Sequence, residues 1–133
     1  LKRLTLILKN KIKNKKISFL GVTFKANTDD MRDSSSLKLI PYLSKKGAKI
    51  KYYDPTGYKK EFKNLKNVEF STSIGQSIKG SDVVIIHTEW NDFKSINFKK
   101  FSKNKKLIIY DMRNIFSSSK IKKIGFKYFG IGR

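Results

Sequence analysis

The sequence predicts an α/β domain with a doubly wound, Rossmann-like, three-layer architecture and a mostly parallel sheet. Two observations carry this prediction. Short segments such as residues 17–22 and 83–86 are largely apolar, and segments with helical spacing of apolar residues separate them. Strands buried on both faces have continuous apolar sequences, and the helices between them cover the sheet. The chain of 133 residues is long enough for one domain with its own core.

The first third of the chain predicts a helix, a strand and a second helix. Residues 1–12 carry apolar side chains at nearly helical spacing, so we expect an amphipathic helix that arrives from a missing upstream part. A strand at about 17–22 and a long polar loop follow. The serines at 34–36 are candidate N-caps of the next helix, and Gly47 is a candidate residue just past its end. Pro41 predicts an irregular or kinked first turn.

The rest of the chain continues the alternation. Strands are predicted at about 48–53, 82–87, 106–110 and 126–131, with a further short strand at 68–70. Helices are predicted at about 73–79, 97–102 and 119–124. Asp54-Pro55 stops the second strand, and the segment from 56 to 67 is a lysine-rich connection. We therefore expect surface lysines such as Lys59 and Lys103 to lie in solvated stretches.

Polar clusters follow four of the predicted strands. Phe24 and Lys25 come after the first strand, Asp54-Pro55 after the second, and residues 87–90 and 111–113 after two later strands. Ligands of parallel α/β sheets bind beyond the carboxyl ends of the strands, so the four clusters predict a binding site at one edge. The long loop after the first strand is either part of this site or a solvated loop with its own ion pairs. Its charged residues are Lys25, Asp29, Asp30, Arg32 and Asp33.

Each charged residue of these clusters has two interpretations. Lys25 and Arg113 are candidates to hold an anion such as a diphosphate, which arginine can bind with two parallel hydrogen bonds. Alternatively each pairs with a nearby aspartate, and Arg32 has the same two possibilities. Asp29 and Asp30 fit loop shaping better than acid–base chemistry.

Two further side chains in these clusters are better explained by structure than by chemistry. His87 is the only histidine, and one histidine does not build a zinc site. Hydrogen bonding at the end of a strand therefore explains it better than a role as a base. Trp90 is expected to pack in the core or against a loop.

The composition excludes several kinds of protein. The chain has no cysteine, so it forms no disulfide and no thiolate site, and it has no apolar run long enough to span a membrane. It lacks a signal peptide and an initiator methionine, so we expect a piece of a longer, cytoplasmic protein. The formal net charge is +21, but only four of the 31 basic residues are arginines. Because nucleic-acid readers favour arginine, we interpret most of this charge as the compositional drift of an AT-rich genome.

Five segments of the chain form an ordered set of motifs: FLGVTFKANTDDMRDSSSLKLIPYL, GAKIKYYDP, SDVVIIHTEWNDF, LIIYDMRNIF and GFKYFGIGR. In this order they resemble the C-terminal UDP-binding domain of the UDP-glucose 6-dehydrogenases. Five ordered motifs are far more specific than any single one, and together they cover nearly the whole chain from about residue 17 onward. The resemblance implies that residues 1–14 are the end of the linker or central-helix region and that residues 15–133 are the UDP-sugar-binding domain.

The resemblance also implies an activity for the full-length protein. The family oxidises UDP-glucose to UDP-glucuronate with two NAD⁺, a step in polysaccharide biosynthesis. Its N-terminal Rossmann domain holds NAD and its catalytic cysteine lies outside the present region, so no catalytic residue is expected in this chain. Phe24 and Lys25 match the pair that contacts the UDP-sugar, Arg113 matches an arginine at the substrate, and Arg32 matches an arginine that reaches NAD. We expect a homodimer or a higher homo-oligomer, with no nucleic-acid or membrane partner.

Some features depart from this pattern or support another protein class. Asp33 and Ser35 stand where the family usually has glutamate and often has proline. Related enzymes that oxidise UDP-N-acetyl-mannosamine or GDP-mannose are the alternative, although the TDD and TEW motifs resemble the UDP-glucose branch more. The alternative of another class is a basic nucleic-acid-binding module. The few arginines, the missing RNA-binding aromatic motif and the polar clusters at the strand ends count against it.

Overall fold

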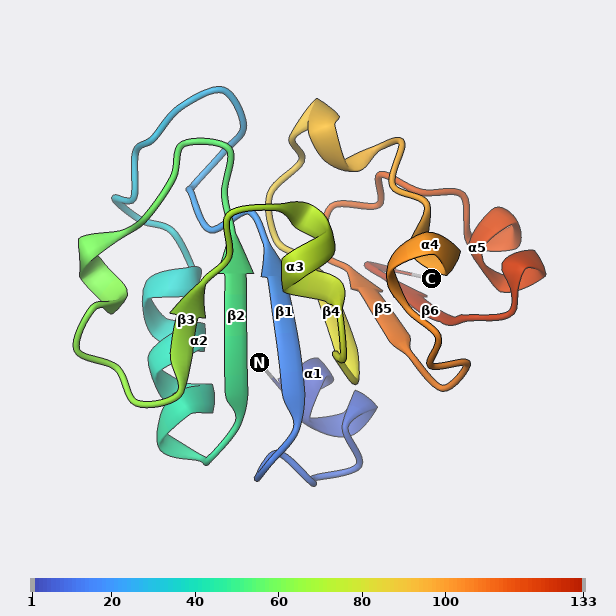
Figure 1. Cartoon of the computed structure of the whole chain (residues 1–133), viewed down its shortest axis with the longest axis horizontal. Helices are drawn as coiled ribbons and strands as arrows, with labels where there is room; N and C mark the ends of the chain where they lie inside the picture. Colours follow the sequence, from blue (N-terminus) through green and yellow to red (C-terminus); the bar gives the residue numbers. More distant parts are fainter. Residues whose placement is uncertain (1, 133) are drawn as a thin grey trace.

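The computed structural model describes residues 2–132, and they form one domain around a six-stranded sheet (Figure 1). All strands are parallel, in the order β3-β2-β1-β4-β5-β6. They are β1 (Lys16–Leu20), β2 (Lys49–Tyr53), β3 (Val68–Phe70), β4 (Val83–Ile86), β5 (Ile108–Asp111) and β6 (Lys127–Gly130). This order is that of the doubly wound dinucleotide-binding folds, with its switch point between β1 and β4. The predicted fold class is confirmed.

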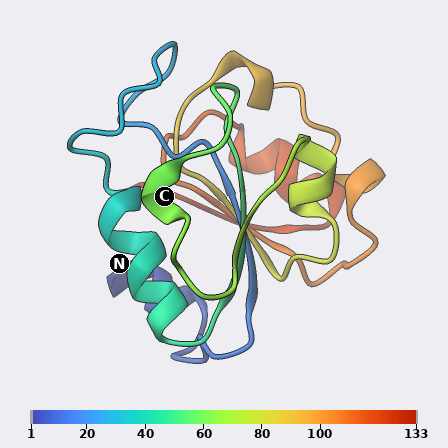
Figure 2. The ribbon, with the colours of Figure 1, turned by 60° about the vertical axis from the view of Figure 1, so that its left-hand side comes forward.

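Helices cover both faces of the sheet and complete the three layers. They are α1 (Lys2–Ile7), α2 (Ser36–Lys45), α3 (Ile74–Ile78), α4 (Phe98–Phe101) and α5 (Ser118–Ile124), with the 3₁₀ turns η1 (Lys60–Phe62) and η2 (Asn91–Phe93). Figure 2 shows α1 and α2 on one side of the sheet, and α3, α4 and α5 on the other. In the part of the chain that the structure describes, no helix is both long and apolar enough to cross a membrane.

The alternation of side chains along each strand divides the core into two clusters. Phe19 and Ile85 point to the side of α1 and α2, where Leu4 and Ile40 pack against them. On the opposite face, Leu20, Val84 and Ile109 pack with Ile78 of α3, Phe98 of α4 and Ile121 of α5. Each central strand is therefore buried on both faces, which explains its nearly continuous apolar sequence.

The structure corrects two details of the first two helices. The helix predicted at 1–12 ends at Ile7, because Lys9 and Asn10 adopt positive φ angles of 54° and 60° and leave the helical conformation. Leu1, at the start of that prediction, lies outside the described residues. Ser35 occupies the N-cap position of α2, but its side chain does not cap the helix. Gly47 has a φ of +93° just past the end of α2, as predicted.

Candidate functional site

The backbone just after β1 is fixed, because buried side chains form hydrogen bonds with both the N–H and the carbonyl oxygen of Val22. The N–H of Val22 donates to Asp54 Oδ2, at the end of β2, over 2.9 Å. Its carbonyl oxygen accepts hydrogen bonds of 2.6 Å from the hydroxyls of Ser34 and Ser36. The loop of residues 21–35 is therefore anchored to β2 and to the start of α2, although it is long and polar.

Gly21 lies at the switch point and allows the ends of β1 and β4 to approach each other closely. Its φ is +79°, and a Cβ atom there would lie 2.6 Å from Cβ of Thr88. The hydroxyl of Thr88 donates to the carbonyl oxygen of Thr23 over 2.9 Å. Any side chain at position 21 would push the two strand ends apart.

His87 is buried behind this edge, and its neighbours fix its tautomer. Because Thr88 Oγ1 gives its single proton to Thr23, it accepts from His87 Nδ1 over 3.1 Å. Nε2 then carries the lone pair and accepts from the Ser35 hydroxyl over 2.8 Å. Burial, and to a smaller extent the positive charge of Arg113, lower the pKa of His87 to about 4. The ring is therefore neutral at pH 7, in the structural role that the sequence predicts.

Arg113 connects the loops that follow three strands. Its Nε donates to the carbonyl oxygen of His87 over 3.0 Å, and its Nη2 donates to the carbonyl oxygen of Phe24 over 3.1 Å. The buried carboxylate of Asp111 holds the turn by accepting the backbone N–H of Arg113 over 3.1 Å. The other oxygen of Asp111 accepts from Phe116 N–H and from the Tyr128 hydroxyl. The guanidinium is thus placed beside the Phe24–Lys25 segment.

The charges at this edge are only partly paired. Among residues 2–132 the one salt bridge joins Arg32 to Asp30, through two hydrogen bonds of 3.0 Å. These side-chain bonds, with one from the Arg32 backbone, lower the pKa of Asp30 to about 2. Lys25 and Arg113 have no carboxylate partner in the same range. Within residues 2–132 the interpretation as a salt bridge therefore holds for Arg32 but not for Lys25 or Arg113, although the charge of Lys25 still acts on Asp30.

The structure brings together three of the four residues that the sequence singles out. Phe24, with 47% of its surface exposed, Lys25 and Arg113 lie together near the switch point. Arg32 is on the same loop, but its guanidinium turns back to Asp30. An exposed ring and two cationic side chains that form no salt bridge within residues 2–132, gathered at one edge, can hold an anionic ligand that has a flat or apolar part.

Sequence reasoning missed the residues that support this edge. Asp54 stood out as a strand stop and as one of the polar clusters, and Ser34 and Ser36 as helix caps, but none of them was expected to hold Val22; all three are buried and do so. Their position directly after an apolar strand or before a helix gave no indication of the partner. Trp90 is buried, as predicted, and its Nε1 has no hydrogen-bond partner among the described residues.

The prediction that Lys59 is exposed to solvent is wrong. Lys59 was expected in a solvated stretch, but it is only 6% exposed, and its Nζ donates to Thr56 Oγ1 over 2.6 Å. Its backbone N–H also donates to the Tyr52 hydroxyl over 2.9 Å, which draws this segment against the sheet. Lys103 is exposed, as predicted.

The described residues fit neither a metal site nor the pyrophosphate cradle of a dinucleotide fold. No group of three histidine, aspartate or glutamate side chains within residues 2–132 could hold a metal ion. A Gly-x-Gly-x-x-Gly turn is missing, because the loop between β1 and α2 contains Gly21 as its one glycine. The hydroxyls at the start of α2 are directed at the Val22 carbonyl instead. This chain therefore lacks the glycine turn that would cradle NAD.

Comparison with known proteins agrees with the geometry. Residues 18–118 match the family model described as UDP-glucose/GDP-mannose dehydrogenase family, UDP binding domain. The UDP-glucose 6-dehydrogenase of Rickettsia prowazekii (strain Madrid E) is 36% identical over 133 residues, which cover 98% of this chain and 31% of the relative. UDP-glucose 6-dehydrogenase TuaD of Bacillus subtilis (strain 168) is 35% identical over 124 residues, 92% of this chain and 27% of the relative.

Solved structures of similar fold include the NDP-N-acetyl-D-galactosaminuronic acid dehydrogenase from Methanosarcina mazei Go1. It is 26% identical, with a TM-score of 0.81, over 99% of this chain and 27% of that chain. A UDP-D-ManNAc dehydrogenase from Pyrococcus horikoshii is 30% identical, with a TM-score of 0.72, over 100% of this chain and 29% of that one. The chain thus spans about 30% of the length of such relatives. It belongs to the UDP-glucose/GDP-mannose dehydrogenase family, and residues 18–118 correspond to the UDP-binding domain of that family.

Proposed function

We propose that this chain is the nucleotide-sugar-binding domain of an NAD-dependent UDP-glucose 6-dehydrogenase. In this proposal the full-length protein oxidises UDP-glucose to UDP-glucuronate, and Phe24, Lys25 and Arg113 bind the substrate. The observation that carries it is the position of Arg113, which is held by two carbonyl oxygens beside Phe24 and Lys25 and forms no salt bridge within residues 2–132. A diphosphate would supply the missing negative charge.

The remaining parts of the reaction belong to the rest of the full-length protein. The chain has no cysteine to form a covalent intermediate and no glycine fingerprint for NAD, so both are assigned outside it. In this proposal Arg32 lies on the NAD side of the full-length protein. Its guanidinium would either leave Asp30 to bind NAD or bind both groups. The homodimeric or higher assembly and the cytoplasmic location stay predictions. Oxidation of UDP-N-acetyl-mannosamine is the second candidate reaction, because the UDP-D-ManNAc dehydrogenase from Pyrococcus horikoshii is 30% identical.

The test is a titration of the full-length protein with UDP-glucose, comparing wild type with Lys25→Ala. A charge-assisted hydrogen bond is worth about 1.5–3 kcal/mol, so binding should weaken roughly tenfold to a hundredfold. Lys103→Ala is the matched control, since that exposed lysine lies in another segment and should leave binding unchanged. Lys59→Ala is unsuitable, because Lys59 is buried.

A mixed oligonucleotide titrated at two salt concentrations tests the rival class. A nucleic-acid binder would spread its affinity over many lysines and lose it steeply with added salt. Tight oligonucleotide binding, together with an unchanged UDP-glucose affinity of Lys25→Ala, would refute the proposed function. UDP-N-acetyl-mannosamine in a parallel titration separates the two dehydrogenase branches.

A further inference from the structure

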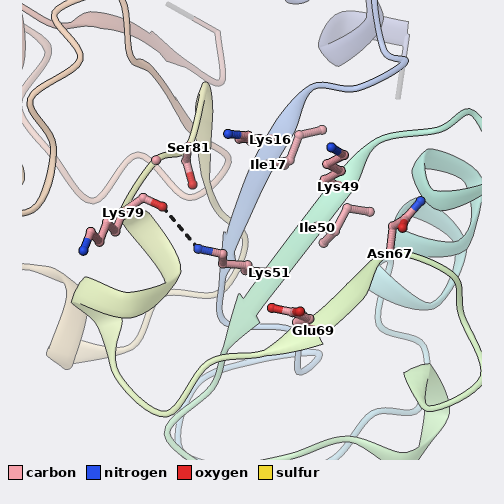
Figure 3. Close-up of a pocket in the computed structure, with 10 residues that line it drawn as sticks. Lys16, Ile17, Lys49, Ile50, Lys51, Asn67, Glu69, Lys79 and Ser81 are labelled. Carbon is pink, nitrogen blue, oxygen red and sulfur yellow. Dashed lines mark hydrogen bonds between the residues drawn. The ribbon is translucent and has the colours of Figure 1, made fainter.

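A second candidate site lies at the opposite edge of the sheet from Arg113. It is a cavity of about 320 Å³ at the amino ends of β1 and β2, beside α3 (Figure 3). Its lining residues are Lys16, Ile17, Lys49, Ile50, Lys51, Asn67, Glu69, Lys79, Gly80 and Ser81. None of them belongs to the site at the carboxyl edge. The volume is at the small end of the range for ligand pockets, about 300–1,000 Å³.

The cavity exists because α3 is too short to cover this face. The helix has five residues, and the chain turns away at Gly80 with a φ of +76°. Ile17 and Ile50 belong to the core on the other side of the sheet, so their neighbours Lys16, Lys49 and Lys51 face the uncovered side. The three lysines are thus carried on two hydrogen-bonded strands, and their backbones are fixed.

The cavity holds more positive charge than its own side chains neutralise. Lys51 Nζ is turned towards the end of α3, where it donates to the carbonyl oxygens of Lys79 over 3.2 Å and of Gln76 over 3.4 Å. The Nζ atoms of Lys16 and Lys49 have no hydrogen-bond or salt-bridge partner within residues 2–132.

Two other lining residues complete the charge balance. Glu69 is the one carboxylate among the described lining residues, and it forms no salt bridge there. Figure 3 shows the Lys79 ammonium directed away from Lys51, so Lys79 contributes its carbonyl and not its charge. Among the lining side chains, these three ammonium groups and one carboxylate leave an excess of two positive charges; Asp82, whose carboxylate accepts the backbone N–H of Lys16 over 2.9 Å, lies just outside the lining.

We propose that this cavity binds a compact anion carrying at least two negative charges, either a phosphorylated or a polycarboxylated small molecule. Lys16 and Lys49 supply the free ammonium groups, and Lys51 supplies a third that is already oriented by α3. Asn67 and Glu69 lie on the β3 side of the cavity. The Asn67 amide can donate hydrogen bonds to hydroxyl groups of the same ligand or accept them, and the Glu69 carboxylate can accept them. The site is separate from the nucleotide-sugar site and does not depend on its assignment.

The experiment measures binding of pyrophosphate to the full-length protein by calorimetry, with UDP-glucose present at saturation to occupy the other site. Citrate in a second titration distinguishes carboxylate from phosphate chemistry, and acetate is the singly charged control. We expect one saturable site for pyrophosphate, citrate or both, and none for acetate. Lys49→Gln should weaken binding about three- to fivefold, as befits an exposed ion pair. Glu69→Gln should strengthen binding, because it removes the opposing charge.

Lys79→Gln is the matched control, because it removes a lysine of the same cavity rim whose charge points elsewhere. It should leave the affinity unchanged while preserving the carbonyl that orients Lys51. Thermal melting of each variant verifies that it is folded. The proposal is overturned if neither pyrophosphate nor citrate saturates a site in the presence of UDP-glucose, or if Lys79→Gln weakens the binding as much as Lys49→Gln. That last result would mean that the overall positive charge, and not the cavity, attracts the anion.

Discussion

Arg113 Nη2 donates a hydrogen bond of 3.1 Å to the carbonyl oxygen of Phe24, a residue 89 positions earlier in the chain. The same guanidinium reaches the carbonyl of His87 through Nε. A side chain from the end of β5 therefore fixes the relative position of the loops after β1 and β4. These loops flank the switch point, so a mobile Arg113 would leave the edge without a defined shape.

Arg113→Lys is the substitution that separates this geometry from the charge. Lysine keeps the positive charge, but its single ammonium does not reproduce the planar fork that reaches two carbonyls. We expect kcat/KM for UDP-glucose in the full-length enzyme to fall roughly tenfold or more, the cost of about one charge-assisted hydrogen bond. Lys120→Ala, at an exposed position of α5, is the control. Unchanged kinetics of Arg113→Lys would show that charge alone suffices.

The ion pair between Asp30 and Arg32 gives a prediction that needs no substrate. Hydrogen bonds from Arg32 hold the pKa of Asp30 at about 2, below its ordinary value of 3.8. Arg32→Ala should raise this pKa towards the ordinary value. An NMR titration of the Asp30 carboxyl carbon measures the change, with Asp29 as an internal reference in the same spectrum. An Asp30 pKa that stays near 2 in the variant would mean that Arg32 does not cause the shift, and an unshifted pKa in the wild type would mean that the pair does not form in solution.

Only part of the candidate site could be predicted from the sequence. Because the carboxyl ends of parallel strands lie at one edge of the sheet, polar clusters that follow apolar strands predict that Phe24, Lys25 and Arg113 lie at that edge. The directions of the side chains were not accessible. Lys25 and Arg32 both lie in a charged loop, yet one has no carboxylate partner within residues 2–132 and the other forms the salt bridge of that range. That choice depends on local backbone turns that a list of charges does not encode.

Burial of polar groups was equally hidden in the sequence. In the sequence Lys59 resembles the many surface lysines, but in the structure its side chain is buried. Its backbone N–H donates a hydrogen bond to the Tyr52 hydroxyl. The cavity beside α3 depends on the length of that helix, which ends at Ile78. The sequence predicts this helix at about 73–79, close to the observed bounds Ile74–Ile78. It does not show how much of the sheet the helix covers, because that depends on how the helix packs against the strands.

The chain alone is predicted to have no dehydrogenase activity. It has no cysteine to form the covalent intermediates that the family's reaction requires, and its β1 turn lacks the glycine cradle for NAD. Absorbance at 340 nm should therefore stay flat when the purified 133-residue chain receives UDP-glucose and NAD⁺. The full-length protein under the same conditions is the positive control. NADH production by the chain alone would contradict the assignment of catalysis to the rest of the protein.

His87 gives the last prediction, which concerns stability against pH. Its pKa is lowered from 6.5 in the free side chain to about 4 in the folded chain, first by burial and then by Arg113. Between these two values the unfolded state binds a proton that the folded state does not bind. The free energy of unfolding therefore rises with pH across this range, and the contribution of His87 is complete above about pH 6.5. As the pH falls to 4, we expect a loss of about 3 kcal/mol from this residue.

Urea unfolding of the 133-residue chain at several pH values tests this prediction, with His87→Gln as the matched variant. Glutamine occupies a similar volume and has hydrogen-bonding groups, but it does not titrate. Carboxylates contribute equally to both proteins, so the difference between the two curves isolates His87. The difference should shrink by about 3 kcal/mol between pH 7 and pH 4, because only the wild type must keep a neutral ring. Parallel curves over that range would mean that His87 titrates normally, and that the bonds to Ser35 and Thr88 do not hold it buried.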